Sequence, residues 1–238
     1  MKFRCERDAL VEQLSTASRA VSSRGGALPV LTGIHLKAHK ETLTMTGSDL
    51  EITVRASVAV DVKESGEAVL PSRIVVDIIR SLDSGAVEVE VSGEEAKISG
   101  GRSQFSVRTL PVDDFPALSD PLGDQVTVAT ADLAAGLKQV VRAASGDDAR
   151  PILTGVLMSA EDGGLRLVAT DSYRLAVRDL PEATVLSEGQ KVLVPSRALD
   201  ELSRVLGDSE EVNVRLGERE VSFDVSIEDG AVQVTTRL

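Results

Sequence analysis

The sequence has few of the residues that disulfides and aromatic cores require. Among its 238 residues there are one cysteine, no tryptophan, one tyrosine and four phenylalanines. A single cysteine, Cys5, cannot form an intrachain disulfide, which fits a reducing compartment. Because aromatic side chains are so scarce, the core must be aliphatic, and this favours sheets rich in Val, Leu and Ile.

Long apolar runs are also missing. No uncharged apolar run approaches the ~18 residues that cross a bilayer. The first six residues, 1–6, contain charges and no apolar signal core. We therefore expect a cytoplasmic protein with no membrane contact. The net charge of −12 indicates no broad affinity for nucleic acid, although it leaves room for a local basic face.

Two halves of the sequence repeat each other. The Pro-Val-Leu-Thr-Gly of 29–33 returns at 151–155 as Pro-Ile-Leu-Thr-Gly, and in both copies an aspartate follows at the same distance. These are Asp49 and Asp171, an offset of 122 residues (171 − 49). A long-period repeat of this kind indicates a duplicated domain. We assign the copies to residues 1–117 and 125–238, with a linker at 118–124 that follows a stiff segment rich in proline and acid.

Each copy has the pattern of an α+β domain. The predicted order is strand, helix, three strands, then strand, helix, three strands. Helices are expected at 8–21, at 72–82, from Thr130 and from Ser196. Ser72, Thr130 and Ser196 are predicted to be helix N-caps, because their hydroxyls can accept backbone N–H groups. The stretch 50–60 alternates apolar and polar residues, as a half-buried strand does.

Signals for catalysis are weak. The sequence has no P-loop, nucleophile elbow or G-x-G-x-x-G. His35 and His39 are four apart and point to one face of a strand-like segment without an evident Cys or carboxylate partner, so we expect no metal site. Asp49 and Asp171 remain a distant hydrolase hypothesis, which predicts turnover that Asp→Asn abolishes. The favoured interpretation is that each aspartate closes its own turn by accepting backbone N–H groups, and we expect no enzyme activity and no cofactor.

Charge is segregated between the helices and the rest of the chain. The predicted helices contain eight basic and six acidic residues, a net charge of +2. The rest of the chain must then carry −14 to give the total of −12. A merely solvated helix face does not predict such segregation. The basic residues are Arg7, Arg19, Arg73, Arg80, Lys138, Arg142, Arg197 and Arg204.

The one tyrosine lies where the two copies diverge. After the shared aspartate, the second copy reads Ser172-Tyr173-Arg174-Leu175. Tyr beside Arg is typical of a recognition hot spot. The alternative, a tyrosine that only packs on a sheet edge, is about equally favoured by the sequence alone.

The order and spacing of these motifs over the whole chain resemble the bacterial DNA polymerase III beta subunit family, the sliding clamps. The features that carry the resemblance are the Met-Lys-Phe start and the segments 28–31, 46–51, 71–73, 110–111, 115–116, 169–171 and 173–175. The resemblance implies a DNA-clamp fold, with two helices per domain packed on one face of antiparallel sheets. It implies a processivity factor that encircles duplex DNA and tethers the replicative polymerase and clamp loader.

The family's protomer has three such domains, and two protomers close head to tail into a ring. This chain resembles the first two domains, so we expect the third to be absent. The alternative is a non-enzymatic clamp-fold binding module that no longer closes a ring. We expect a monomer, in which the edge strand that closes the ring in the family lies unpaired. The residues of that edge are Arg102, Gln104, Phe105 and Val107.

The resemblance also assigns roles to individual residues. In clamps the helices face the phosphates without reading bases, which allows sliding. The residues implied in sequence-independent binding of duplex DNA are Arg24, Arg73, Arg80, Lys138, Arg142, Arg150, Arg197 and Arg204. A hydrophobic pocket in clamps takes short linear motifs of polymerase and clamp loader. The residues implied in this pocket are Leu153, Thr170, Ser172, Tyr173, Arg174 and Leu175, where Ser172 replaces a glycine common in the family.

Overall fold

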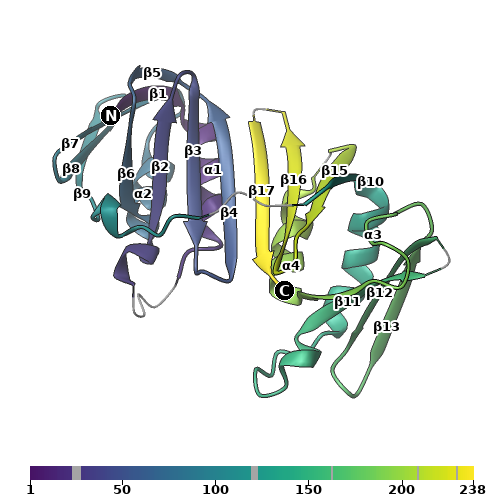
Figure 1. Cartoon of the computed structure of the whole chain (residues 1–238). Coiled ribbons are helices and arrows are strands. Elements are labelled where there is room, and N and C mark those ends of the chain that lie inside the picture. Colours follow the sequence, from purple (N-terminus) through teal and green to yellow (C-terminus); the bar gives the residue numbers. More distant parts are fainter. Residues whose placement is uncertain (23–27, 119–122, 162, 208, 229) are drawn as a thin grey trace. The chain divides into compact units, whose positions relative to one another are not determined.

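The computed structural model describes residues 1–238 except 23–27, 119–122, 162, 208 and 229 (Figure 1). The chain forms two compact units, residues 1–119 with 228–232, and residues 120–227 with 233–238. Most of the predicted 118–124 linker thus falls outside the described residues. No helix in the described parts of the chain is long and apolar enough to cross a membrane.

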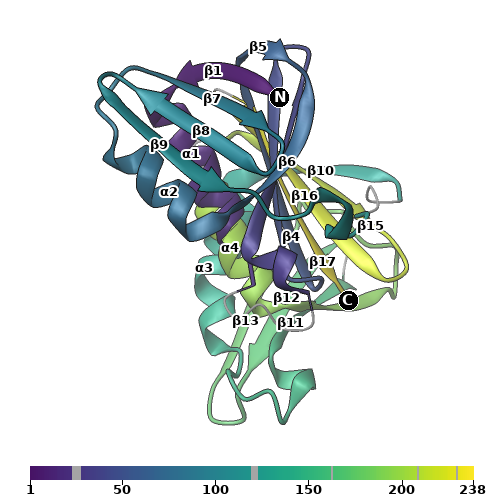
Figure 2. The same cartoon turned by 90° about the vertical axis from the view of Figure 1, so that its left-hand side faces the viewer.

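The first unit packs two helices against antiparallel sheets. One sheet has the strand order β5-β1-β7-β8-β9 and the other runs β4-β3-β2-β6. Helices α1 and α2 lie side by side (Figure 2), with α1 on β3 and β4 and α2 on β2 and β6. The elements are β1 (Lys2–Glu6), α1 (Arg7–Ser18), η1 (Pro29–Thr32), β2 (Gly33–His39), β3 (Thr42–Ser48), β4 (Ile52–Ala59), β5 (Asp61–Glu64), β6 (Gly66–Pro71), α2 (Ser72–Ser81), β7 (Ala86–Ser92), β8 (Glu95–Gly100), β9 (Ser103–Arg108) and η2 (Val112–Asp114).

Helix α1 approaches its sheet closely because β3 carries a glycine at the crossing. A Cβ built on Gly47 would collide with the backbone carbonyl oxygen of Ala17 on the helix. The helix buries Leu10, Leu14 and Ala17 against the strands. The aliphatic face of α1 therefore packs directly on β3 at Gly47. Such close aliphatic packing is the kind of core expected of a chain with few aromatic residues.

The second unit repeats this plan. One of its sheets has the strand order β13-β12-β11-β14, and the other runs β10-β15-β16-β17. Helix α3 packs on β12 and β13, and α4 on β11 and β14. The elements are β10 (Gln125–Ala129), α3 (Thr130–Val140), η3 (Val141–Ala143), η4 (Pro151–Leu153), β11 (Gly155–Glu161), β12 (Gly164–Thr170), β13 (Leu175–Leu180), β14 (Lys191–Pro195), α4 (Ser196–Val205), β15 (Glu211–Leu216), β16 (Glu220–Ile227) and β17 (Gly230–Arg237). The predicted α+β class with antiparallel sheets is confirmed.

The predicted helix caps are wrong. The N-cap positions are occupied by Pro71, Ala129 and Pro195, without a capping side-chain bond. The first helical residues are Ser72, Thr130 and Ser196. Strand leads directly into helix at these points, so the hydroxyls fall inside the first turn. The Ser72 side chain is buried.

Two strand predictions also differ from the structure. The strand expected at 50–60 starts at Ile52, because Asp49 and Leu50 form a turn in which Leu50 has a φ of +75°. Strand β5 was not predicted from the sequence, and it pairs with β1 at the sheet edge. It has four residues, Asp-Val-Lys-Glu, in which a single apolar residue gives no alternation to read.

Candidate functional site

The basic residues of α2 that are predicted to bind DNA lie on its exposed side. Arg73 and Arg80 are exposed, whereas Val75, Val76 and Ile79 are buried. The Arg80 Nη2 donates to Ser15 Oγ of α1 at 3.2 Å. Within the described residues Arg73 forms no ion pair, so its charge faces solvent. Arg24, predicted with them, lies outside the described residues.

The second unit presents a similar but partly neutralised set. Lys138 on α3 and Arg142 on η3 are exposed and form no ion pair with any described residue. Arg197 and Arg204 are exposed on α4. However, Arg204 contacts Asp200 at 2.6 Å and Glu201 at 3.1 Å, so two carboxylates offset its charge. Arg204 therefore adds less positive potential than its position in the sequence indicates.

Arg150 lies apart from the helices. Its Nε contacts Asp147 Oδ2 at 3.0 Å, and its Nη1 donates to Ser172 Oγ at 3.4 Å. The predicted DNA residue Arg150 is thereby joined to the predicted pocket residue Ser172. This contact brings the loop before η4 beside the turn before β13.

The turn that precedes β13 is organised by Asp171. Its Oδ1 accepts the backbone N–H groups of Tyr173 and Arg174, both at 2.9 Å. These two bonds hold the pKa of the Asp171 carboxyl below its ordinary value. Thr170 Oγ1 accepts the N–H of Ser172 and donates to the carbonyl of Arg174 at 2.6 Å. The turn holds Ser172 at a φ of +78°.

The first unit has the same turn. Asp49 Oδ1 accepts the backbone N–H groups of Glu51 and Ile52 at 3.1 and 2.8 Å. Both aspartates thus close turns, and this prediction from the sequence is confirmed. It removes the observation on which the hydrolase hypothesis depended. No group of three His, Cys, Asp or Glu side chains in the described residues is placed to hold a metal ion.

Around the second turn several apolar side chains are exposed. The exposed fractions are 76% for Ile152, 91% for Tyr173, 66% for Leu175 and 50% for Val177. Leu153 is half-buried beside Ile152 on η4. We call these five residues the β13 surface. Four exposed apolar residues on neighbouring segments are typical of an interaction surface rather than of isolated exposure, which favours the recognition hypothesis over a tyrosine that merely packs.

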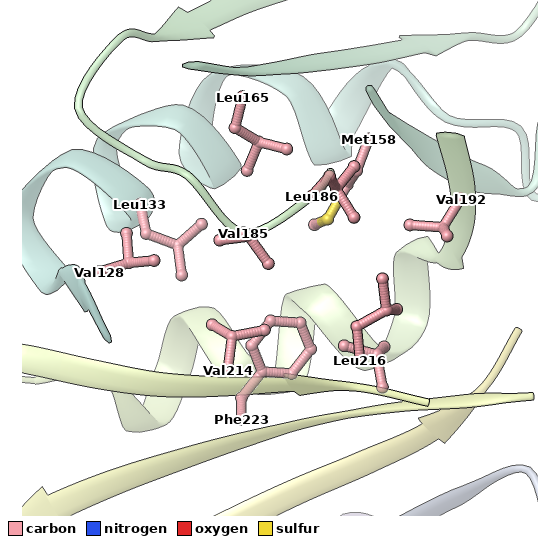
Figure 3. Close-up of a pocket in the computed structure, with 11 residues that line it drawn as sticks. Val128, Leu133, Met158, Leu165, Val185, Leu186, Val192, Val214, Leu216 and Phe223 are labelled. Atoms are coloured by element: carbon pink, nitrogen blue, oxygen red, sulfur yellow. The ribbon is translucent and has the colours of Figure 1, made fainter. Parts of the chain in front are cut away.

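An apolar pocket of this unit lies elsewhere and carries no chemistry. It lies in the core, measures about 10 Å³ and is lined by aliphatic side chains, Met158 and Phe223 (Figure 3). About this much space holds a single water, and a lining without polar groups gives a water no partner. None of the predicted pocket residues lines it.

The predicted edge residues lie at the border of the first unit's sheet. Strand β9 is the last strand in the order β5-β1-β7-β8-β9. Arg102 and Gln104 are exposed, Phe105 is 37% exposed, and Val107 is buried in the core. Val107 therefore contributes only its backbone to this edge.

Comparison with known proteins gives one consistent result. The profile of the DNA polymerase III beta subunit N-terminal domain matches residues 1–119, and that of the central domain matches residues 127–238. The beta sliding clamp of Streptomyces coelicolor is 35% identical over all of this chain and 64% of its own length. That of Micrococcus luteus is 35% identical over 92% of this chain and 70% of its own.

Solved structures agree with the sequence comparisons. The sliding clamp of Bacillus subtilis superposes with a TM-score of 0.89 at 31% identity, covering 100% of this chain and 64% of that one. The DNA polymerase III subunit beta of Pseudomonas aeruginosa gives 0.90 at 30% identity with the same coverage. The chain thus spans about two thirds of the length of these relatives. With both domain profiles matched in order, the chain belongs to the DNA polymerase III beta subunit family.

Proposed function

We propose that the chain provides two domains of a DNA sliding clamp, a non-catalytic processivity factor that encircles duplex DNA and tethers the bacterial replicative polymerase. The observation that carries the proposal is the coverage of the whole chain by the Bacillus subtilis clamp at a TM-score of 0.89. Its place of action is the cytoplasm, where the bacterial chromosome lies.

The helix surfaces support the DNA part of the proposal. Arg73, Lys138, Arg142 and Arg197 are exposed cations on or next to helices of both units. Cations on a helix wall attract phosphates without reading base edges, so the bound protein is free to slide. The acidic remainder of a chain with a net charge of −12 repels DNA elsewhere.

Fluorescence anisotropy with a labelled duplex tests this part. Neutralising about four phosphates gives a salt exponent near −3.6, so raising salt from about 50 to about 200 mM weakens binding by roughly 10². Arg73→Ala combined with Arg197→Ala should reduce the exponent by about 2. The matched control is Arg4→Ala, an exposed arginine on strand β1, which should leave the exponent unchanged. Binding that ignores salt, or that depends on sequence, contradicts the proposal.

The β13 surface supports the partner part. We assign this surface and the adjoining Asp171 turn to short linear motifs of the replicative polymerase and the clamp loader. The contacting residues are Leu153, Thr170, Ser172, Tyr173, Arg174 and Leu175. Exposed Tyr173 beside Arg174 has the composition of an anchor site. Calorimetry with such a motif peptide should show weaker binding to Tyr173→Ala than to the unmodified chain. Equal affinity places the peptide elsewhere.

A further inference from the structure

Helix α4 holds one of its two arginines between two carboxylates. Arg204 Nη2 lies 2.6 Å from Asp200 Oδ2, one helical turn earlier, and Arg204 Nη1 lies 3.1 Å from Glu201 Oε1. The side chains of Asp200 and Arg204 are each 52% exposed, whereas that of Glu201 is 12% exposed. Asp200 is therefore the carboxylate that meets solvent on the same helix face as Arg204.

The corresponding helix of the first unit lacks this carboxylate. The internal repeat aligns Arg80 with Arg204 and Val76 with Asp200, an offset of 124 residues (204 − 80). Val76 is buried, so it presents no charge to solvent. Arg80 donates to the hydroxyl oxygen of Ser15 on α1, at 3.2 Å, and forms no ion pair within the described residues. Its positive charge is therefore not offset by a bound carboxylate.

This single difference changes the net charge of the helix. Helix α2 carries two arginines and one aspartate, a net charge of +1 (2 − 1). Helix α4 carries two arginines and two carboxylates, a net charge of 0 (2 − 2). Every other charged position keeps its sign between the two helices, so Asp200 accounts for the whole difference. Two helices of the same origin thus offer different charges to a phosphate.

We propose that Asp200 sets the strength with which α4 contacts duplex DNA, by holding Arg204 in an ion pair that competes with phosphate. The inference rests on the proposed function, in which exposed helix cations meet the phosphates. A phosphate that approaches Arg204 must displace the Asp200 carboxylate and is repelled by its charge. Arg204 therefore provides less than a full phosphate contact, and the weaker contact makes it easier for the chain to move along the duplex.

The ion pair affects phosphate binding more than it affects folding. Both side chains are half exposed, so solvent and salt screen the pair and it adds little stability. Asparagine has the size of aspartate and a similar helix propensity. Asp200→Asn should therefore keep the helix while it removes the competing charge.

Fluorescence anisotropy of the full chain with a labelled duplex tests the proposal. One additional phosphate contact strengthens binding by roughly eightfold at about 100 mM salt, and it raises the magnitude of the salt exponent by about 0.9. We expect Asp200→Asn to change both quantities in this direction and toward these values. Should Asp200→Asn fail to fold, Asp200→Ala is measured against the same criteria.

The second unit offers a matched control. Asp179 Oδ1 on β13 lies 2.6 Å from Arg166 Nε on β12, and Arg166 also contacts a second carboxylate, that of Glu161. Asp179→Asn makes the same change in charge, beside an arginine that is likewise held by two carboxylates, but it does so on strands. It should leave the affinity and the exponent nearly unchanged, because the phosphates are expected to meet the helices.

A double-mutant cycle shows whether Asp200 acts through Arg204. Asp200→Asn combined with Arg204→Ala should bind duplex DNA no more tightly than Arg204→Ala alone. A gain that persists without Arg204 overturns the proposal, since Asp200 would then repel DNA without masking that cation. An equal gain from Asp179→Asn overturns it as well.

The outcomes separate this inference from the proposed function. If the unmodified chain binds DNA with a clear salt dependence and Asp200→Asn leaves it unchanged, only the role of Asp200 is wrong. If binding ignores salt in every variant, or if none of the proteins binds the duplex, the proposed function is contradicted and the role of Asp200 falls with it.

Discussion

At the scale of single residues, the turn before β13 holds a serine against its conformational preference. Ser172 has a φ of +78°, and its counterpart Leu50 has +75°. The left-handed region costs an L-residue roughly 1–2 kcal/mol, while glycine enters it freely. The hydrogen bonds to Asp49 and Asp171 fix the positive φ in both units. Any residue other than glycine at these two positions is therefore strained.

Ser172→Gly should therefore stabilise the protein relative to Ser172→Ala. Both changes remove the hydroxyl that Arg150 contacts, and only glycine removes the Cβ. After subtracting the greater freedom of glycine in the unfolded chain, the difference should be about 1 kcal/mol in favour of glycine. Thermal unfolding followed by circular dichroism measures it. A glycine variant that unfolds below the alanine variant would show that the turn carries no strain.

Residue-level prediction from the sequence succeeded where the signal was local. An aspartate after a strand indicated a turn closed on its own backbone, and both turns are present. The partner of His35 was missed, because Glu67 comes from β6, and its Oε2 lies 3.2 Å from His35 Nε2. The left-handed residues were missed because serine and leucine give no sign of positive φ.

At the scale of elements, His35 of β2 stacks on Phe115, which follows η2, with ring centroids 5.0 Å apart. Burial lowers the pKa of His35 below 6.5, against the opposing effect of Glu67 and together with the nearby Lys37. The unfolded chain then binds the proton more readily than the folded one. The contribution of neutral His35 to the free energy of unfolding should be fully present above the pKa that His35 has in the unfolded chain. It should be lost as the pH falls from there toward the lower pKa of the folded chain.

His35→Phe should reduce this pH dependence while preserving a ring for Phe115 to stack on. Between about pH 7 and about pH 5 the melting temperature of the unmodified chain should fall further than that of the variant. The pKa of Glu67 is lowered from 4.5, chiefly by Lys37, so its contribution is lost only at more acidic pH. If the melting temperatures of the two proteins fall equally with pH, His35 binds the proton equally well in the folded and unfolded chain, and the prediction is wrong.

The helix ends show why element boundaries were less predictable than element types. Ser72, Ser196 and Thr130 look like caps because they begin apolar periodic stretches. In the structure each is preceded by a strand residue that serves as the cap, and Ser196 instead donates its hydroxyl and its N–H to the Thr154 carbonyl. That contact spans 42 positions in the sequence, so no local pattern reveals it.

At the scale of the whole molecule, the open edge of strand β9 bears on the expected oligomeric state. Among the described strands, β9 pairs with β8 alone and leaves its other edge open. Open edges are templates for strand addition. The net charge of −12 opposes association between copies, and Arg102 and Arg108 flank the edge with like charges.

We therefore predict a monomer at micromolar concentration. Static light scattering in physiological salt measures the mass directly, with the 25.1 kDa chain as reference. A monomer, together with loss of DNA retention, would favour the alternative of a clamp-fold binding module that no longer closes a ring. A stable ring-like dimer would show that these two domains suffice for closure.

The duplication was visible in the sequence because glycine, proline and aspartate at turns keep their spacing. The difference between the two copies was not visible. Val30 and Ile152 are both β-branched aliphatic residues, yet one is 3% and the other 76% exposed. Leu50, Leu110, Val112 and Phe115 pack against the cluster that contains Val30. Three of these residues lie about 80 positions or more downstream of Val30 (110 − 30), and such long-range packing leaves no periodic trace.

The exposed Tyr173 also makes the chain its own fluorescent probe. The sequence has no tryptophan and one tyrosine, so ultraviolet emission arises almost entirely from a side chain that is 91% exposed on the β13 surface. Tyrosine emission from this protein reports on events at that surface without a competing background. A ligand that covers the ring will change the emission, whereas unfolding, which leaves an already hydrated ring hydrated, will barely alter it.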